Sequence, residues 1–322
     1  MLLLSKFLQG LVMAALPPAL NKLTQEISGQ SGFTEQVSRN ETAAHMGTLS
    51  LNVACGLLGA SLYGTRWTWA MFAAPAALVA ALAAGHRRFR GELEAVRMGR
   101  GFGVGGGTLT GGASSGETLT PEEIPLKERP FAAFLLICFL FHLVNAVALP
   151  LSMQAINKLG SDAWDNNTGS SFDFLLSTLC VSLSQACMVY VAPKVRGTDR
   201  YGRKPAFLAA TFVLGVRCLL LSLFCRILEG GGGGVARALV LSMSALDGFT
   251  AGVFNVMFVL VCMDLAGPGR ISSYVGMAGT AINLGGTLSG FIGEFAAGEI
   301  GYSTTFLYMG VSASALAMAV KR

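Results

Sequence analysis

The chain alternates long apolar stretches with short polar segments. Nine stretches of about 20 residues carry almost no charge, and this is the length that an α-helix needs to cross a bilayer. Because a backbone in lipid must satisfy its own hydrogen bonds, repeated crossing predicts helices. The predicted spans are 3–21, 45–64, 67–85, 131–153, 174–193, 204–226, 236–262, 273–294 and 302–320. The pattern therefore predicts an all-α, multi-pass integral membrane protein with about nine transmembrane helices.

The composition agrees with a membrane protein. Hydrophobic residues make up 52% of the 322 positions, and charged residues only 13%, about half the roughly 25% of soluble domains. The seven cysteines lie inside the apolar stretches without CxxC spacing, so we expect small buried hydrophobes rather than metal ligands. The net charge of +5 is distributed in a way that indicates topology rather than nucleic-acid binding. We expect no cofactor, no metal and no nucleic-acid partner.

A polar, glycine-rich segment divides the chain. Residues 86–130 include "GFGVGGGTLTGGASSGETLTPEEIP", a composition typical of flexible linkers. Its "GRGFGVGGG" follows no strand signal and precedes no helix signal, so a phosphate-binding loop is not expected. We expect three units: a partial N-terminal half at 1–85 with three helices, the linker, and a six-helix bundle at 131–322.

The basic residues predict the orientation in the membrane. If the 86–130 linker lies inside, the inner segments hold 17 Lys and Arg residues and the outer segments hold 4. Such an excess is the usual mark of the cytoplasmic side. The linker is therefore predicted to be cytoplasmic, while the sequence does not distinguish a plasma membrane from an organelle membrane.

One inner loop, between the fifth and sixth spans, is unusually charged. In "GTDRYGRKPAF", Asp199 precedes a helix start, where the helix dipole favours an acid. Gly202 permits a turn too tight for a side chain. The basic residues of the loop are Arg200, Arg203 and Lys204. They are expected to hold the loop at the inner face and to pair with Asp199 or with carbonyl ends of neighbouring helices. The chemistry leaves open whether the loop is a latch between two bundles or only inner-side charge.

The "DRYGRK" motif resembles the loop signature of the major facilitator superfamily, which comprises secondary transporters with two six-helix halves. Its position is similar to that of the copy between helices eight and nine, although Val195 replaces the usual Gly. The stretches "FLQGLVMAALPPALNKLTQEISG", "FLFHLVNAVALPLSMQ" and "LDGFTAGVFNVMFVLVCMDLAGPGR" are similar to helices four, seven and ten. The resemblance implies that the nine spans correspond to helices four to twelve. A fragment or misassigned start is favoured over a reduced descendant as the reason that helices one to three are missing.

Polar groups inside the spans are the candidate site residues, because such groups are costly in lipid. Arg217 and Asp247 lie on consecutive helices, roughly 20 and 25 Å from the inner end at 1.5 Å per residue. These similar depths predict an intramembrane ion pair, which is either a structural lock or a proton- or substrate-responsive switch. The resemblance implies that helices four, seven and ten line the cavity. The cavity candidates are Gln9, His142, Asn145, Asp247 and Asn255. His142 either carries a proton or is satisfied by a neighbouring helix.

Two further patterns concern packing. Glu41 and His45 belong to an inner-side polar cluster that is expected to pair with the linker or with the missing first-half loop, and that has too few ligands for a metal. The motifs Gly248-x-x-x-Gly252 and Gly286-x-x-x-Gly290 predict that two helix pairs approach closely.

No catalytic motif such as GxSxG or HExxH occurs, so an enzyme is not expected. The resemblance implies a secondary active transporter that moves a small solute by alternating access, with proton coupling through Asp247 or His142 as an option. The alternative is a non-transporting membrane scaffold, or partner-binding protein, derived from a truncated transporter. The expected partners are thus a small-molecule solute, protons and the lipid bilayer.

Overall fold

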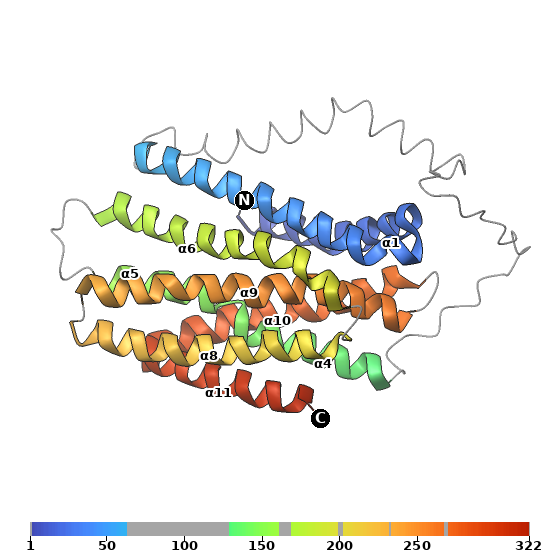
Figure 1. The fold of residues 1–322 in the computed structure, drawn as a ribbon. Coiled ribbons are helices and arrows are strands. Elements are labelled where there is room, and N and C mark those ends of the chain that lie inside the picture. Colours follow the sequence, from blue (N-terminus) through green and yellow to red (C-terminus); the bar gives the residue numbers. More distant parts are fainter. Residues whose placement is uncertain are drawn as a thin grey trace, which may run out of the picture.

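The computed structural model describes residues 2–62, 129–160, 169–198, 202–231, 233–266 and 270–321. All regular elements in these ranges are helical, and they lie side by side as a bundle (Figure 1). They are α1 (Leu2–Leu62), α4 (Arg129–Asn145), α5 (Ala148–Gly160), α6 (Gly169–Val191), the 3-10 helix η3 (Ala192–Gly197), α8 (Lys204–Glu229), α9 (Gly233–Ala266), α10 (Ile271–Ile300) and α11 (Tyr302–Lys321).

Several of these helices suit a bilayer. Within the described residues, five helical segments are long and apolar enough to cross a membrane. They are Arg129–Leu159, Phe174–Val195, Lys204–Glu229, Gly233–Ala266 and Tyr302–Lys321. These segments agree with predicted spans and support the all-α membrane fold. The span expected at 67–85 lies outside the described residues, as does the linker expected at 86–130, except that its last two residues already belong to α4.

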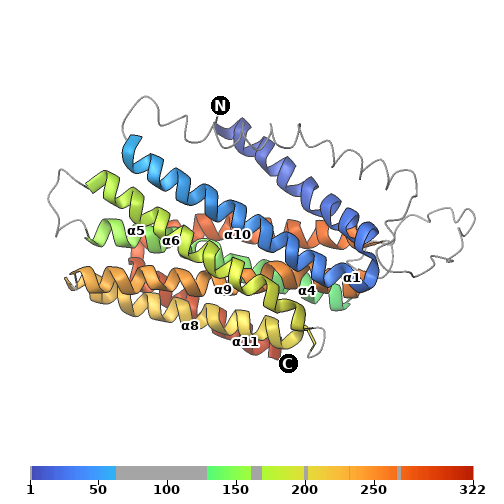
Figure 2. The ribbon, with the colours of Figure 1, turned by 45° about the horizontal axis from the view of Figure 1, so that its top comes forward.

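The long helix α1 is in fact two arms. It bends at Gly29, where φ is 64° and ψ is 178°, a conformation that glycine adopts without steric cost. Figure 2 shows the two arms diverging from this bend and running back along the bundle. The spans predicted at 3–21 and 45–64 leave 22–44 between them as a polar segment on the inner side. In the structure helix continues through most of this segment, because apart from glycine it contains no strong helix breaker.

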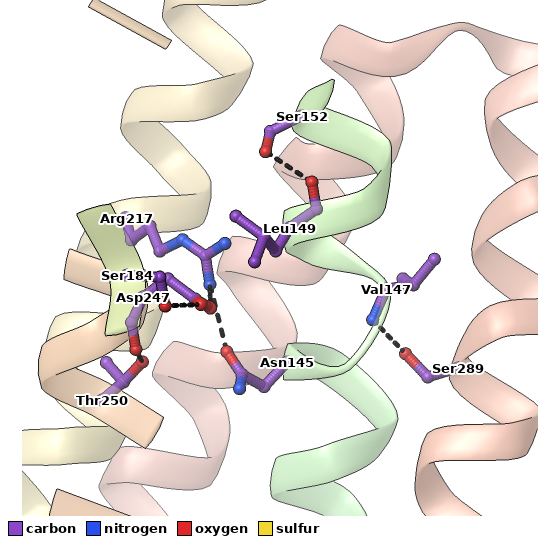
Figure 3. A network of polar contacts seen from close by, with 9 residues as sticks. All are labelled: Asn145, Val147, Leu149, Ser152, Ser184, Arg217, Asp247, Thr250 and Ser289. Atoms are coloured by element: carbon purple, nitrogen blue, oxygen red, sulfur yellow. Dashed lines mark hydrogen bonds and ion pairs between the residues drawn. The ribbon is translucent and has the colours of Figure 1, made fainter. Parts of the chain in front are cut away.

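The helix predicted at 131–153 is broken in two. α4 ends at Asn145 and α5 begins at Ala148. Pro150 explains the break, because it has no N–H and its ring would clash with the carbonyl of Ala146 four residues earlier. At the break the N–H of Val147 donates not to its own helix but to the Oγ of Ser289 in α10, at 3.1 Å. This contact ties the broken helix to α10 (Figure 3).

Small residues bring α9 against α6. A Cβ at Gly248 would collide with the carbonyl oxygen of Ser184 and would lie 2.7 Å from the Cβ of Cys187. A Cβ at Gly252 would lie 3.1 Å from the Cα of Met188. Only glycine permits this separation, so the packing predicted from Gly248-x-x-x-Gly252 is confirmed.

The corresponding prediction for α10 is wrong, because Gly286 and Gly290 are not the glycines that pack tightly. A Cβ at Gly290 would have nothing within 4 Å among the described residues, and one at Gly286 would meet only Ala146, at 3.6 Å. The tight contacts are instead at Gly285, against the backbone of α4, and at Gly293, where a Cβ would lie 2.5 Å from Val147. The face that α10 turns toward α4 is therefore rotated from the predicted one.

Candidate functional site

A buried charged network lies beside the break between α4 and α5 (Figure 3). Arg217 of α8 donates from Nη1 to Oδ1 of Asp247 in α9 at 2.6 Å, and the two side chains are 0% and 7% exposed. The same Nη1 donates to Oδ1 of Asn145 at 3.1 Å. Ser184 of α6 donates to Oδ2 of Asp247 at 2.7 Å. The structure thus brings together the two charges that were expected to pair, and joins them to side chains from two further helices.

The two charges of the network pair with each other, but not every N–H group of Arg217 has a hydrogen-bond partner among the described residues. Nε and Nη2 of Arg217 are buried and have no hydrogen-bond partner among the described residues. Unmet donors on a buried guanidinium are costly, so the ion pair with Asp247 is what makes the burial of Arg217 tolerable. Removal of Asp247 would leave a buried, uncompensated positive charge.

A small cavity of about 150 Å³ lies between α1, α4, α9 and α10. Its polar lining residues are His142, Asn255, Thr280 and Asn283. The first arm of α1 contributes Pro17 and Pro18. Among the described residues, none that lines this cavity is Asp, Glu, Lys or Arg. The cavity therefore offers amide, hydroxyl and imidazole groups without a fixed charge.

The tautomer of His142 follows from its surroundings. Its Nδ1 lies 3.1 Å from the carbonyl oxygen of Cys138 one turn earlier. A carbonyl only accepts, so Nδ1 carries the hydrogen, and Nε2 of the neutral ring is left as an acceptor. The ring also packs edge-on against Phe254, with centroids 4.9 Å apart. His142 is thus held by its own helix and by an aromatic neighbour while it lines the cavity.

The cavity candidates divide into two groups. His142 and Asn255 line the cavity, whereas Asn145 and Asp247 belong to the buried network. The side chain of Gln9 lies outside the described part of the chain. From the sequence, Asn283 was expected to serve packing and Thr280 was not singled out, because the resemblance directed the search to helices four, seven and ten and both residues lie on α10.

A second cavity is larger, about 580 Å³, and lies between α4, α10 and α11. Most of the side chains around it are apolar, and none of the predicted candidates is among them. The smaller cavity is therefore the better candidate for recognising a solute, because binding sites combine an apolar lining with a few placed polar groups.

The charged loop leads from η3 into α8 and contacts the end of α9. Gly202 has a φ of 84° and donates its N–H to the carbonyl oxygen of Thr198 at 2.8 Å. Arg203 pairs through Nε with Oδ2 of Asp264 at 3.1 Å. Lys204 is the first residue of α8, and Asp199 and Arg200 lie outside the described residues. The described partner of Arg203 at the end of α9 is thus a carboxylate that the sequence did not predict.

Comparison with known proteins then shows which transporters the chain is similar to. Two curated proteins from two strains of Mycobacterium tuberculosis, each named as an uncharacterized MFS-type transporter, are 28% identical to this chain over 309 residues. The alignments cover 95% of this chain and 67% of each relative. Over almost its whole length, the chain is therefore similar to transporters of the major facilitator superfamily. No family model matches, and no solved structure matches.

This similarity to the major facilitator superfamily agrees with the helices described above. The prediction of an all-α, multi-pass integral membrane protein of this family is confirmed. Both relatives are named as transporters rather than as enzymes. In general terms, therefore, the protein is a membrane transporter.

Proposed function

We propose that this major facilitator protein is a secondary active transporter, which moves a small uncharged solute by alternating access. The cavity carries the proposal, because α1 lines it together with α4, α9 and α10 of the C-terminal part. Transporters of this kind bind their solute between two helical units that rock about a central site. A solute held between Pro18 on one side and His142 on the other would be released by such a movement.

The lining restricts the chemistry of the solute. Two amides, a hydroxyl and an imidazole can donate and accept hydrogen bonds, and no described lining residue carries a fixed charge. The volume of about 150 Å³ is below the roughly 300–1,000 Å³ of pockets for drug-sized ligands. We therefore expect a small neutral solute that carries hydroxyl, amide or similar groups.

The buried network would position one wall of this cavity. His142 lies three residues before Asn145, at the end of α4, and Asn145 accepts a hydrogen bond from Arg217. The ion pair therefore holds the α4 end that presents His142. In this proposal Arg217 and Asp247 are positioning residues, and a change in the protonation of His142 would alter the hydrogen bonding in the cavity.

Uptake into proteoliposomes tests the proposal. The purified full chain would be reconstituted and offered a labelled hexose, a labelled neutral amino acid and a labelled nucleoside, with an imposed pH gradient. We expect uptake of at least one probe. We also expect Asn255→Ala and Thr280→Ala to lower it about tenfold, since each hydrogen bond lost to a solute is worth about 1 kcal/mol or more.

Thr287→Ala is the matched control. Thr280 and Thr287 both lie on α10, both are exposed, and both donate to a carbonyl four residues earlier, at 2.9 and 2.8 Å. Only Thr280 lines the cavity, so Thr287→Ala should keep wild-type uptake. Thermal stabilisation by a probe without uptake of any probe would instead support the membrane scaffold.

A further inference from the structure

The second arm of α1 packs closely against α6. A Cβ at Gly56 would collide with the side chain of Thr178. Ser38 is 2% exposed and donates to the carbonyl oxygen of Ala192, just beyond α6, at 2.6 Å. We call this the α1–α6 contact. It joins the N-terminal part of the described chain to the helices that hold the buried network.

A histidine with one unmet nitrogen lies in this contact. His45 of α1 is 8% exposed, and its Nδ1 lies 2.9 Å from Oε1 of Gln185 in α6. Because Oε1 only accepts, Nδ1 carries the hydrogen in this arrangement. Nε2 is buried without a hydrogen-bond partner among the described residues, and Oε2 of Glu41 lies 3.6 Å from it. A neutral ring would thus turn a lone pair toward a carboxyl group.

One more proton, on either His45 or Glu41, would stabilise this arrangement. If Glu41 is ionised and His45 is neutral with its hydrogen on Nδ1, two electron-rich atoms face each other without a hydrogen between them. A proton on either atom changes the contact into a favourable one. The side chain of Glu41 is only 29% exposed, and burial raises its pKa from 4.5 to about 7. The protonated form is therefore favoured while α1 and α6 stay packed.

Among the described residues, no cation is found paired with the Glu41 carboxyl group. Within the described ranges, Glu41 forms no ion pair with Lys or Arg; Arg39 pairs with Glu35 at 2.7 Å. Between Phe174 and Val191, α6 contains no charged residue, and its titratable groups near this end are Cys187 and Tyr190. Of the charged groups on other elements against α1, four have contacts of their own: Lys194 of η3 with Tyr190, Asp247 of α9 with Arg217, Asp264 of α9 with Arg203, and Arg270 of α10 with Tyr274.

We propose that Glu41, His45 and Gln185 form a proton-binding site in the α1–α6 contact, which is loaded while the two helices are packed and emptied when they separate. One proton passes from water to a Glu41 carboxylate oxygen and returns to water. Nothing else is consumed. The site deepens the proposed transport function, on which it rests, by naming the proton as the coupling ion and by giving it a location.

The same helix connects this site to the buried network. Gln185 contacts His45, and its neighbour Ser184 donates to Asp247. The carbonyl of Ser184 also lies where Gly248 permits the closest approach of α9. A displacement of α6 that breaks the Gln185 contact would therefore be passed to Asp247, and from there through Arg217 to the end of α4.

The sign of the pH dependence follows from linkage. The pKa of Glu41 is about 7 in the packed state and returns toward 4.5 when separation hydrates the carboxyl group. Protonation of Glu41 stabilises the packed state fully below pH 4.5, and this stabilisation is lost as the pH rises through about 7. The ratio of separated to packed molecules should rise up to tenfold per pH unit between these values and level off above about pH 7.

Pulsed electron-spin distance measurements test the site without any solute. Spin labels on unnatural amino acids would replace Thr48 of α1 and Ala186 of α6, both exposed, in the full chain in nanodiscs. From about pH 5 to about pH 7.5, the ratio of separated to packed molecules should rise at least tenfold. A wild-type ratio that does not change with pH overturns the proposal, whatever the variants do.

Two glutamate variants assign the effect. Glu41→Gln should abolish the pH dependence and keep the helices packed, because it resembles the protonated acid. Glu35→Gln is the matched control, one to two turns earlier on the same arm, and should keep the wild-type profile. A Glu41→Gln profile like that of wild type places the proton elsewhere and overturns the site. Because no solute is present, failed uptake with an intact pH profile refutes only the transport function.

Discussion

Two acid–base pairs contact neighbouring residues of one helix, and they differ in nearly every other respect. The pair of Arg217 and Asp247 is separated by 2.6 Å, and its side chains are 0% and 7% exposed. The pair of His45 and Glu41 is separated by 3.6 Å, and its side chains are 11% and 29% exposed. The first pair contacts Ser184, and the second contacts Gln185.

The difference lies in the base. A guanidinium keeps its charge at every physiological pH, so the pair inside the bundle is a fixed attraction. An imidazole gains or loses its charge near neutral pH, so the pair in the α1–α6 contact depends on a proton. The same helix thus faces a permanent ion pair on one side and a variable one on the other. This division suits a helix that must stay in its bundle while its outer contact opens.

Breaking the pair of Arg217 and Asp247, the fixed pair, should have the largest effect on stability. Asp247→Asn leaves Arg217 buried without a counter-charge, and removing one partner of such a pair typically costs about 3–5 kcal/mol of unfolding free energy. Denaturation of the purified protein in detergent, followed by circular dichroism, would measure this loss. Asp264→Asn is the control, because Asp264 is 43% exposed and an exposed pair contributes about 1 kcal/mol or less.

The same variants separate a lock from a switch. Equal stability of Asp247→Asn and Asp264→Asn would contradict the structural importance of the buried pair. If Asp247→Asn folds and takes up solute normally, the pair has no part in switching. Lost uptake in a variant that retains its fold would favour the switch.

Features set by position along one helix could be predicted from the sequence. The apolar stretches gave the helices, and the "DRYGRK" motif gave the family that the relatives confirm. The contact between Arg217 and Asp247 followed from counting residues from the ends of two consecutive helices, because depth in a bilayer is proportional to residue number.

Features set by helix rotation could not be predicted. The glycines in tight contact are Gly285, against α4, and Gly293, against Val147, rather than Gly286 and Gly290, and a one-residue error turns a helix by about 100°. The contact between His45 and Gln185 joins residues 140 positions apart, and nothing in the spacing of either helix selects it. Such pairings are decided by how side-chain ridges of neighbouring helices fit together.

A smaller effect should follow from removing the link between α6 and the fixed pair. Ser184→Ala deletes the 2.7 Å hydrogen bond to Asp247, and a bond to a charged acceptor contributes about 1.5–3 kcal/mol. The detergent denaturation assay would show the loss. Ser182→Ala is the control, because the Ser182 hydroxyl is buried without a partner among the described residues. A Ser182 variant as unstable as the Ser184 variant would attribute the loss to packing.

The smallest expected effect concerns the close approach of α9 to α6. Gly248→Ala places a methyl group against the carbonyl of Ser184, and overpacking of this kind costs about 1–3 kcal/mol. Part of that is offset, because alanine stabilises a helix by about 1 kcal/mol over glycine. Gly290→Ala has the helix gain without the collision, since nothing described lies within 4 Å, and should be neutral or slightly stabilising. The Gly248 variant should therefore be less stable than the Gly290 variant in the same detergent denaturation assay. Equal stability of the two variants would mean that α9 moves away from α6 at little cost, and that Gly248 does not fix their separation.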